Sequence, residues 1–467
     1  MNNRVCTLSQ PCTRGSVFRY RSFEIDAERG ALTCHYDLDG REFAERVTLA
    51  PGPRWHTEAA RAAARLVFLL AGVSYYKTAA PPVIDFGETA LTEAELAFLR
   101  EFYLQGLGEF AYRNNLDLTE MRLEAPRAQA LTPGQAQTPA PAQLPGPAPI
   151  PAPTAPDRHR RALVPFGGGI DSIVTVEQIR PRADVALFVV SRPADRFDAI
   201  EQPAAVTGLP IVRAEREIDP QLLRSAELGF LNGHVPVTGI LSAIAVLSAV
   251  LEDRDAVVMS NEWSASIPTL EHAGRPVNHQ FSKSEEFEAS FREILSQNQA
   301  PLPEYFSWLR DRTELWVGQE FAALTRYHDS FRSCNKAFYT DPARRYTHWC
   351  GQCDKCCFID LILAPFLPDK ALCCIFAVTG EPLGDPGLAA KFRSLLGAGA
   401  KPFECVGEVT ECRAAVLLAA RREDRAGSAL LQELAAEVAS WPDAPSEAEA
   451  AAMLRPVGRN FIPNELR

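Results

Sequence analysis

Uninterrupted apolar runs alternate with helical patterns through the middle of the chain. Such runs are typical of strands buried on both faces, whereas a strand with one exposed face alternates apolar and polar residues. The pattern predicts a parallel sheet covered by helices on both faces, a doubly wound α/β domain whose ligands bind at the carboxyl ends of the strands. We expect strands over residues 163–165, 183–191, 209–213 and 256–260, and helices over 196–207 and 239–251.

The regions on either side of this domain have different patterns. Residues 17–49 consist of short alternating runs with Asp39-Gly40 between two of them, which predicts an antiparallel hairpin in a small sheet. Apolar residues recur at helical spacing over 54–71, near 93–107 and over 414–454, whereas Pro, Ala, Gln and Gly dominate 126–156. We therefore expect a small α+β N-terminal domain over 1–125, a Pro/Ala-rich linker over 126–160, the α/β domain over 161–300 and a helical, Cys-rich region over 301–467.

Composition narrows the possible partners. A net charge of −11 disfavours nonspecific nucleic-acid binding, which depends on Lys and Arg contacts to phosphates. We expect no membrane span and no signal peptide, because no apolar run is long enough and the first residues lack a leader pattern. Twelve cysteines without a secretory signal indicate metal ligands or reduced thiols, so we expect a cytoplasmic protein.

The first apolar strand leads into a glycine-rich loop that suits a phosphate group. Gly167, Gly168 and Gly169 let the backbone approach an anion at the start of a helix, and Ser172 can donate to a phosphate oxygen. Asp171 is explained by a Mg²⁺ ion that bridges the protein and a polyphosphate. The loop lacks the Lys of a Walker A loop and the third glycine of a dinucleotide fingerprint. It resembles the PP-loop of the ATP pyrophosphatases, Ser-Gly-Gly-x-Asp-Ser; the alternative is a glycine-rich turn without a ligand.

A cysteine array in the C-terminal region indicates a metal site. Cys334, Cys350, Cys353 and Cys356 have the spacing C-x15-C-x2-C-x2-C, which can bring four thiolates around one tetrahedral zinc ion. Reduced core thiols are the alternative. The array resembles the four-cysteine zinc site of the PP-loop enzymes that make 7-cyano-7-deazaguanine, although its first spacing is longer. We expect Cys373-Cys374 to lie in the core, because their surroundings are apolar.

Four further polar clusters are candidates for an active site. Asn232 and His234 precede an apolar helix, where a turn and a helix cap would also explain them. The cluster over 260–266 directly follows a strand, where its polar side chains have little reason to interrupt apolar sequence unless they face a ligand. The clusters over 277–284 and 401–407 place ionisable side chains beside turn formers, and solvated loops are the alternative there. Their candidate residues, together with Ser191 and Arg192 at the end of a strand, are Asn232, His234, Asn261, Glu262, His279, Lys283 and Cys405.

Several of these strings together resemble one family, the ATP-dependent UDP-N-acetylmuramoyl-L-alanyl-L-glutamate epimerases of bacterial peptidoglycan synthesis. The strings lie at residues 70–77, 167–172, 260–266, 278–284, 349–356 and 401–405. The resemblance implies a PP-loop (HUP-type) fold and inversion of the terminal L-glutamate of a sugar-nucleotide dipeptide, with ATP cleaved to AMP and pyrophosphate and with Mg²⁺ required. It places Gly167, Gly168, Gly169, Asp171 and Ser172 at ATP, together with Ser191, Arg192, Asn232, His234 and Asn261.

The chemistry requires two groups that carry protons. A carboxylate makes its own Cα–H very weakly acidic, and adenylation relieves this by turning the carboxylate into a mixed anhydride that accepts charge. A base then removes the Cα proton from one face and an acid returns one to the other. The candidates are His279, Glu262, Lys283 and Cys405, since a proton carrier needs reach and a tunable pKa. The rival readings are another PP-loop enzyme that forms an amide, nitrile or thiolated product, and a noncatalytic zinc-ribbon scaffold, which the acidic composition disfavours.

Overall fold

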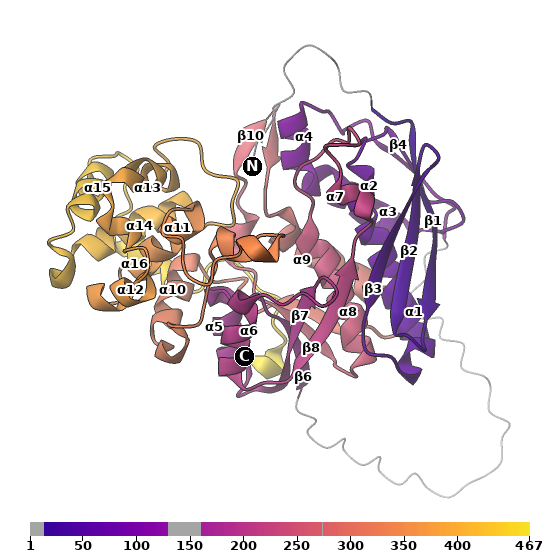
Figure 1. The fold of residues 1–467 in the computed structure, drawn as a ribbon, viewed down its shortest axis with the longest axis horizontal. Helices are drawn as coiled ribbons and strands as arrows, with labels where there is room; N and C mark the ends of the chain where they lie inside the picture. The colour runs from indigo at the N-terminus through magenta and orange to yellow at the C-terminus, as the bar shows by residue number, and fades with distance from the viewer. Residues whose placement is uncertain (1–13, 129–159, 273) are drawn as a thin grey trace, which may run out of the picture.

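The computed structural model describes residues 14–128, 160–272 and 274–467. A ten-stranded sheet runs through these residues, and its N-terminal strands lie at the right of Figure 1. In spatial order its strands are β12 (Glu304–Ser307), β9 (Ala256–Met259), β6 (Arg160–Pro165), β7 (Ala183–Ser191), β8 (Ile211–Glu217), β3 (Arg41–Thr48), β2 (Ala31–Leu38), β1 (Val17–Asp26), β4 (Val83–Asp85) and β5 (Arg122–Glu124). The strands from β12 to β8 pair in parallel, as their apolar runs predict.

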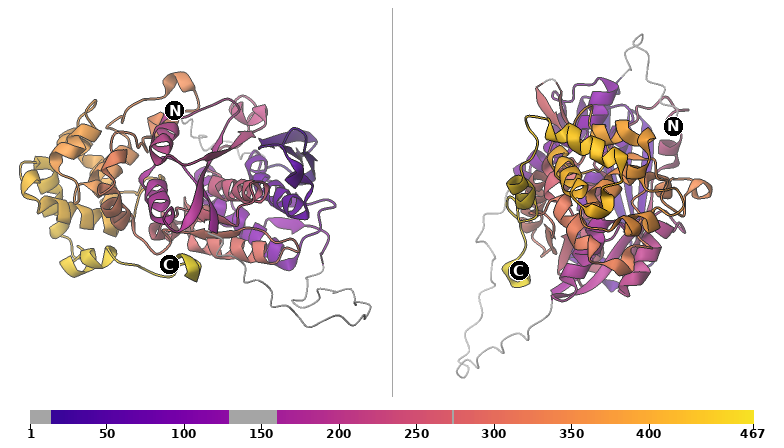
Figure 2. Two further views of the ribbon diagram at one scale, coloured as in Figure 1. Left: turned by 90° about the horizontal axis from the view of Figure 1, so that it is seen from below. Right: turned by 90° about the vertical axis from the view of Figure 1, so that its left-hand side faces the viewer.

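The parallel strands separate two apolar cores. In β6, Ala162 and Val164 belong to one core and Leu163 to the other. Because successive side chains of a strand point to opposite faces, both faces of the sheet are buried here, and the predicted doubly wound α/β fold is confirmed. One face carries α5 (Ile170–Ile179), α6 (Asp198–Thr207) and α10 (Glu314–Ala322), and the other carries α1 (Glu58–Ala71), α3 (Glu93–Gly106), α8 (Val237–Leu251) and α9 (Glu285–Ser296) (Figure 2).

The N-terminal strands extend this sheet. β1, β2 and β3 pair in an antiparallel arrangement, as predicted, and Asp39 and Gly40 form the turn between β2 and β3 with φ of 51° and 87°. β3 also pairs with β8, so that one sheet joins this hairpin to the parallel strands of the α/β domain. The domain boundaries at 125, 160 and 300 stay a prediction, and most of the predicted linker lies outside the described residues.

The C-terminal region is helical, as predicted, and packs on the face that carries α5 and α10. Its helices are α11 (Asp354–Leu363), α12 (Asp369–Ile375), α13 (Ala389–Leu395), α14 (Val409–Ala420), α15 (Ala429–Ala439) and α16 (Glu447–Met453). The helical pattern over 414–454 is therefore divided among three helices. The expectation that Cys373 and Cys374 lie in the core is wrong: both are exposed, because the short helix α12 buries Leu372 instead.

Several short elements connect these parts. They include α2 (Val73–Tyr76), α4 (Gly108–Asn114), α7 (Pro220–Leu223) and a two-stranded hairpin of β10 (Leu270–His272) and β11 (Arg275–Val277). In the described part of the chain, the helices are too short or too polar to cross a membrane.

Candidate active site

The glycine loop lies between β6 and α5, at the carboxyl end of an inner strand. Gly168 has a φ of 76°, and a Cβ built there would lie 2.2 Å from the carbonyl oxygen of Ala199, so only glycine fits. A Cβ at Gly167 would meet nothing within 4 Å, which shows open space above the loop. Ser172 lies in the first turn of α5 and donates to the carbonyl oxygen of Gly169 at 3.1 Å. The loop therefore has the shape of an anion site at a helix N-terminus.

Three carboxylates converge beside this loop. Asp171 from α5, Glu262 after β9 and Glu314 from α10 each place an oxygen within 4.8 Å of the others. Asp171 Oδ1 is buried and has no hydrogen-bond partner among the described residues. Burial and the negative charge of Glu262 raise the pKa of Asp171 to about 7. Carboxylate oxygens that lie this close together repel one another, and a divalent cation bound among them would neutralise their charge. Mg²⁺ prefers oxygen ligands, so the site fits Mg²⁺.

A fourth carboxylate, Glu411 of α14, adjoins this cluster. It is fully buried, its Oε2 accepts from the backbone N–H of Leu315, and its Oε1 has no partner among the described residues. Burial raises the pKa of Glu411 to about 8, and the negative charge of Glu262 adds to this effect. Sequence reasoning missed Glu314 and Glu411. Glu314 follows the helix-capping residue Thr313, in the first turn of a helix, where an acid is common because it interacts favourably with the helix dipole. The sequence around Glu314 therefore did not indicate an active-site role.

A thiol, an imidazole and a carboxylate from remote parts of the chain form a second cluster. His279 Nδ1 pairs with Glu109 Oε2, and Glu109 Oε1 also pairs with Arg113 at 2.5 Å. Burial lowers the pKa of His279, but hydrogen bonds to Cys405 and Glu109 outweigh burial and raise it to about 9. Burial raises the pKa of Cys405, but the charge of Lys283 and the hydrogen bond with His279 outweigh it and lower the pKa to about 6. At neutral pH the pair is therefore a thiolate and an imidazolium.

Lys283 connects the two clusters. Burial disfavours its charge, but the negative groups Cys405, Glu262 and Asp171 hold the pKa of Lys283 above its ordinary value. The glycine loop, the carboxylates and the thiolate–imidazolium pair therefore share one buried centre.

His234 and Asn232 lie on the outer side of the Cys405–His279–Glu109 cluster. The His234 ring centroid is 4.3 Å from that of His279, and burial together with the charge of His279 lowers the pKa of His234 to about 4. Asn232 Oδ1 accepts from the amine of Lys77 at 2.8 Å, and burial lowers the pKa of Lys77 to about 8. The structure thus groups these two residues with the candidate proton carriers, and their predicted contact with ATP stays a prediction.

The remaining ATP-binding candidates lie at the ends of strands. Ser191 ends β7, and its hydroxyl accepts from Arg196 at 3.3 Å. The guanidinium of Arg192 is held by Asp195 at 2.8 Å. Asn261 is buried after β9, where its backbone N–H donates to the Ser307 hydroxyl at 2.7 Å. Their roles stay predictions.

The four cysteines of the predicted array meet. One sulfur from each of Cys334, Cys350, Cys353 and Cys356 lies within 4.8 Å of the others. The Cys353 and Cys356 sulfurs are 3.4 Å apart, and those of Cys350 and Cys356 are 3.7 Å apart. A tetrahedral ion with metal–sulfur bonds of about 2.3 Å sets its ligands about 3.8 Å apart. The spacing of the sulfurs therefore suits a single metal ion.

A glycine loop after an inner strand of a doubly wound sheet, beside buried acids, defines a PP-loop-type enzyme. Residues 10–308 match the family described as MurL N-terminal domain, and residues 330–449 match the MurL C-terminal domain. The chain is 36% identical over 459 residues to the UDP-N-acetyl-alpha-D-muramoyl-L-alanyl-L-glutamate epimerase of Xanthomonas oryzae, covering 97% of this chain and 96% of that one. The chain belongs to this epimerase family and is an isomerase.

Two further relatives have the same description. The Salinispora tropica protein is 35% identical, with 96% of this chain and 94% of that one covered, and a Micromonospora protein is 37% identical, with 96% of each covered. Among solved structures, a U34-tRNA thiolase from Methanococcus maripaludis with its [4Fe-4S] cluster is 13% identical and has a TM-score of 0.25 over 40% of this chain and 63% of that one. That likeness is too weak to support an argument.

Proposed function

We propose that this enzyme inverts the terminal L-glutamate of UDP-N-acetylmuramoyl-L-alanyl-L-glutamate, with ATP cleaved to AMP and pyrophosphate. The observation that carries the proposal is the meeting of two kinds of site at Lys283: a glycine loop suited to phosphates and a thiolate–imidazolium pair suited to proton transfer. The names of the full-length relatives support the substrate. An enzyme that only bound ATP would not need the second site.

Adenylation solves the central difficulty of the reaction. Removing a proton beside a carboxylate places a second negative charge next to the first, and each unit of pKa costs about 1.4 kcal/mol. Attack of the glutamate α-carboxylate on the α-phosphorus of ATP forms a mixed anhydride and releases pyrophosphate. The anhydride carbonyl accepts the charge of the carbanion as an enolate. Water then releases AMP after the proton has been returned.

The glycine loop and Ser172 would hold the leaving pyrophosphate. Asp171, Glu262 and Glu314 would hold Mg²⁺, which neutralises the polyphosphate when it is bound. Burial and neighbouring carboxylates raise the pKa of Asp171, Glu314 and Glu411, and a divalent cation bound among them would offset this repulsion. Titration with Mn²⁺, followed by its electron paramagnetic resonance, should show weaker binding in Glu314→Gln than in Glu320→Gln on the same helix. Equal binding would contradict this ligand set.

The assignment of proton carriers rests on the charges around Cys405. Lys283 and His279 both lower the pKa of Cys405, so a thiolate is favoured there at neutral pH. His279 is itself held by Glu109, and we assign it the role of keeping the thiolate charged. In this scheme Cys405 removes the proton from the L-face of Cα, and the Lys283 ammonium returns one to the opposite face.

The four-cysteine cluster would hold a structural zinc ion. It contains no open ligand position, since four sulfurs complete a tetrahedron, and such closed sites stabilise a fold. Its contribution is to fix the start of α11, which begins after Cys353 and packs against α10 and α14.

The reaction itself tests the proposal. Purified enzyme, Mg-ATP and the L-Ala-L-Glu muramoyl nucleotide in heavy water should give D-glutamate after hydrolysis, deuterium at Cα and one pyrophosphate per turnover. The variant Lys283→Met should still exchange the Cα proton of the L-substrate but not invert it, whereas Cys405→Ser should do neither. Inversion without ATP would reject the adenylate, and a product of altered mass would indicate amide, nitrile or thiolation chemistry instead.

A further inference from the structure

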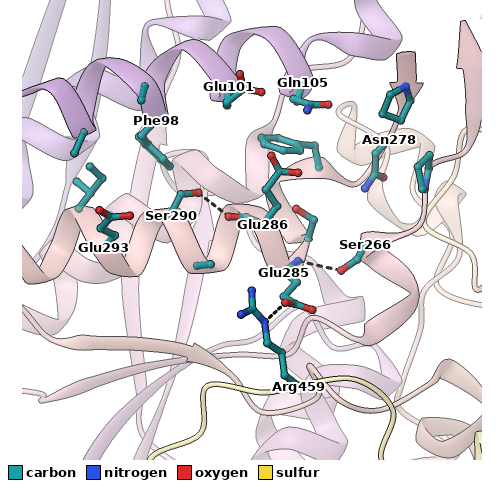
Figure 3. Close-up of a pocket in the computed structure, with 18 residues that line it drawn as sticks. Phe98, Glu101, Gln105, Ser266, Asn278, Glu285, Glu286, Ser290, Glu293 and Arg459 are labelled. Carbon is teal, nitrogen blue, oxygen red and sulfur yellow. Dashed lines mark hydrogen bonds and ion pairs between the residues drawn. The ribbon is translucent and has the colours of Figure 1, made fainter. Parts of the chain in front are cut away.

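Two cavities of similar size border the β10–β11 hairpin, and Pro268 lines both. The larger, about 710 Å³, lies between α3 and α9 (Figure 3). Glu101, Glu285, Glu286 and Glu293 line it with one base, Arg459, which pairs with Glu285. Four acids against one base repel an anion, so this cavity does not suit a diphosphate.

The second cavity, about 660 Å³, has the opposite balance of charge. It lies between α4, the hairpin and the loop over 397–403, and Arg113, Lys401 and Arg413 line it with a single acid, Glu408. Arg113 pairs with Glu109 and Arg413 with Asp443, both outside the lining, and Lys401 pairs with Glu408. Each guanidinium has five N–H donors and the ammonium has three, so donors remain for a phosphate. In a chain with a net charge of −11, this concentration of bases is a local exception.

The wall of this cavity also offers backbone and aromatic surfaces. Gly397 and Gly399 precede Lys401, and a Cβ at Gly399 would meet nothing within 4 Å, so the backbone there is open to a ligand. Tyr112 is 39% exposed, and its ring centroid lies 5.9 Å from that of Phe403. An exposed tyrosine beside a second ring suits the face of a planar base.

The cavity shares a wall with the proton carriers. Arg113 lines the cavity and also pairs with Glu109, which holds His279. Phe403 lines it too, and its ring centroid is 6.3 Å from that of His279. The substrate named above carries its nucleotide and its glutamate at opposite ends, so it requires two adjoining subsites of this kind.

We propose that the cavity lined by Arg113, Lys401 and Phe403 binds the uridine diphosphate end of the substrate, with the base against Tyr112. This inference rests on the proposed function for the identity of the substrate. Calorimetric titration with UDP, with a nonhydrolysable ATP analogue saturating the glycine loop, measures the subsite directly. Gly399→Asp adds a negative charge to the wall where space is open, and Gly399→Asn is its neutral match of the same shape.

UDP should bind the wild type and Gly399→Asn alike, and about tenfold more weakly to Gly399→Asp, because a like charge a few ångströms from a diphosphate is strongly unfavourable. The KM for the substrate should rise by a similar factor with little change in kcat. Tyr112→Leu should weaken UDP binding but leave pyrophosphate binding unchanged, and this second variant does not depend on the folding of the 397–403 loop. Glu286→Gln in the acidic cavity should bind UDP as the wild type does.

Equal UDP affinity in the Asp and Asn variants would overturn the subsite, as would failure of UDP to bind a wild-type enzyme that inverts its substrate. A different result would reject the proposed function. A wild-type enzyme that does not invert the glutamate with Mg-ATP would reject that function and the substrate named here with it.

Discussion

Glu109→Gln tests whether the N-terminal part of the chain sets the charge of the proposed Cys405–His279 catalytic pair. Glu109 accepts from His279 and is itself kept ionised: burial raises its pKa, but His279 and Arg113 outweigh burial and lower it. A hydrogen bond to a charged group contributes about 1.5–3 kcal/mol and a neutral one about 0.5–1.5 kcal/mol. Replacing the charged hydrogen bond with a neutral one therefore destabilises the His279 imidazolium by about 1.4 kcal/mol, which lowers the pKa of His279 by about one unit.

The activity of the wild type should rise through pH 6 as Cys405 loses its proton and fall through pH 9 as His279 loses its own. In Glu109→Gln the fall should move to about pH 8, with kcat roughly tenfold lower at neutral pH because a weaker, neutral hydrogen bond holds the ring. The assay is the pH profile of glutamate inversion, together with an NMR titration of the His279 ring. The exposed Glu120→Gln is the control. An unchanged His279 pKa in a folded Glu109→Gln variant would refute the reasoning.

Three further outcomes follow from other parts of the site. Cys405→Ser should remove the limb of the pH profile near pH 6 and lower the rate of deuterium exchange at least a thousandfold, since a serine hydroxyl does not ionise there; an intact limb would exclude the thiolate. Gly168→Ala should lower the free energy of unfolding by about 1–3 kcal/mol, because its backbone has positive φ and its Cβ meets the Ala199 carbonyl, whereas Gly167→Ala should melt as the wild type does. Cys356→Ser should lose one bound zinc by elemental analysis and melt several degrees lower than wild type, whereas a variant that keeps zinc would contradict the cluster.

The parts of the fold that depend on local pattern could be predicted from the sequence. The strand over 183–191 has the bounds of β7, and the glycine loop joins a strand to a helix as expected. The four cysteines also converge, because C-x2-C spacing limits where their sulfurs can point. In each of these cases, the interactions that determine the structure lie among a few residues that are neighbours in the sequence.

The partners that come from remote segments could not be predicted. Glu109 lies in a helix where Arg113 one turn later offers an ordinary i,i+4 ion pair, so nothing in its surroundings indicated His279. Glu411 lies in an Ala-rich helix and resembles a solvated acid, although it is fully buried. The pairing of β3 with β8 also joins distant strands. For Cys373 and Cys374 the local pattern was misleading: their apolar neighbours predicted burial, but both side chains are exposed on a short helix.

The Cys405–His279–Glu109 cluster draws one member from each of three widely separated stretches of the chain. During synthesis on the ribosome, the glycine loop is complete long before Cys405 leaves the exit tunnel. Under the proposed function, a nascent or truncated chain would thus contain the glycine loop without the thiol that moves a proton. Such a chain would not epimerise its substrate until the segment around Cys405 has joined the rest.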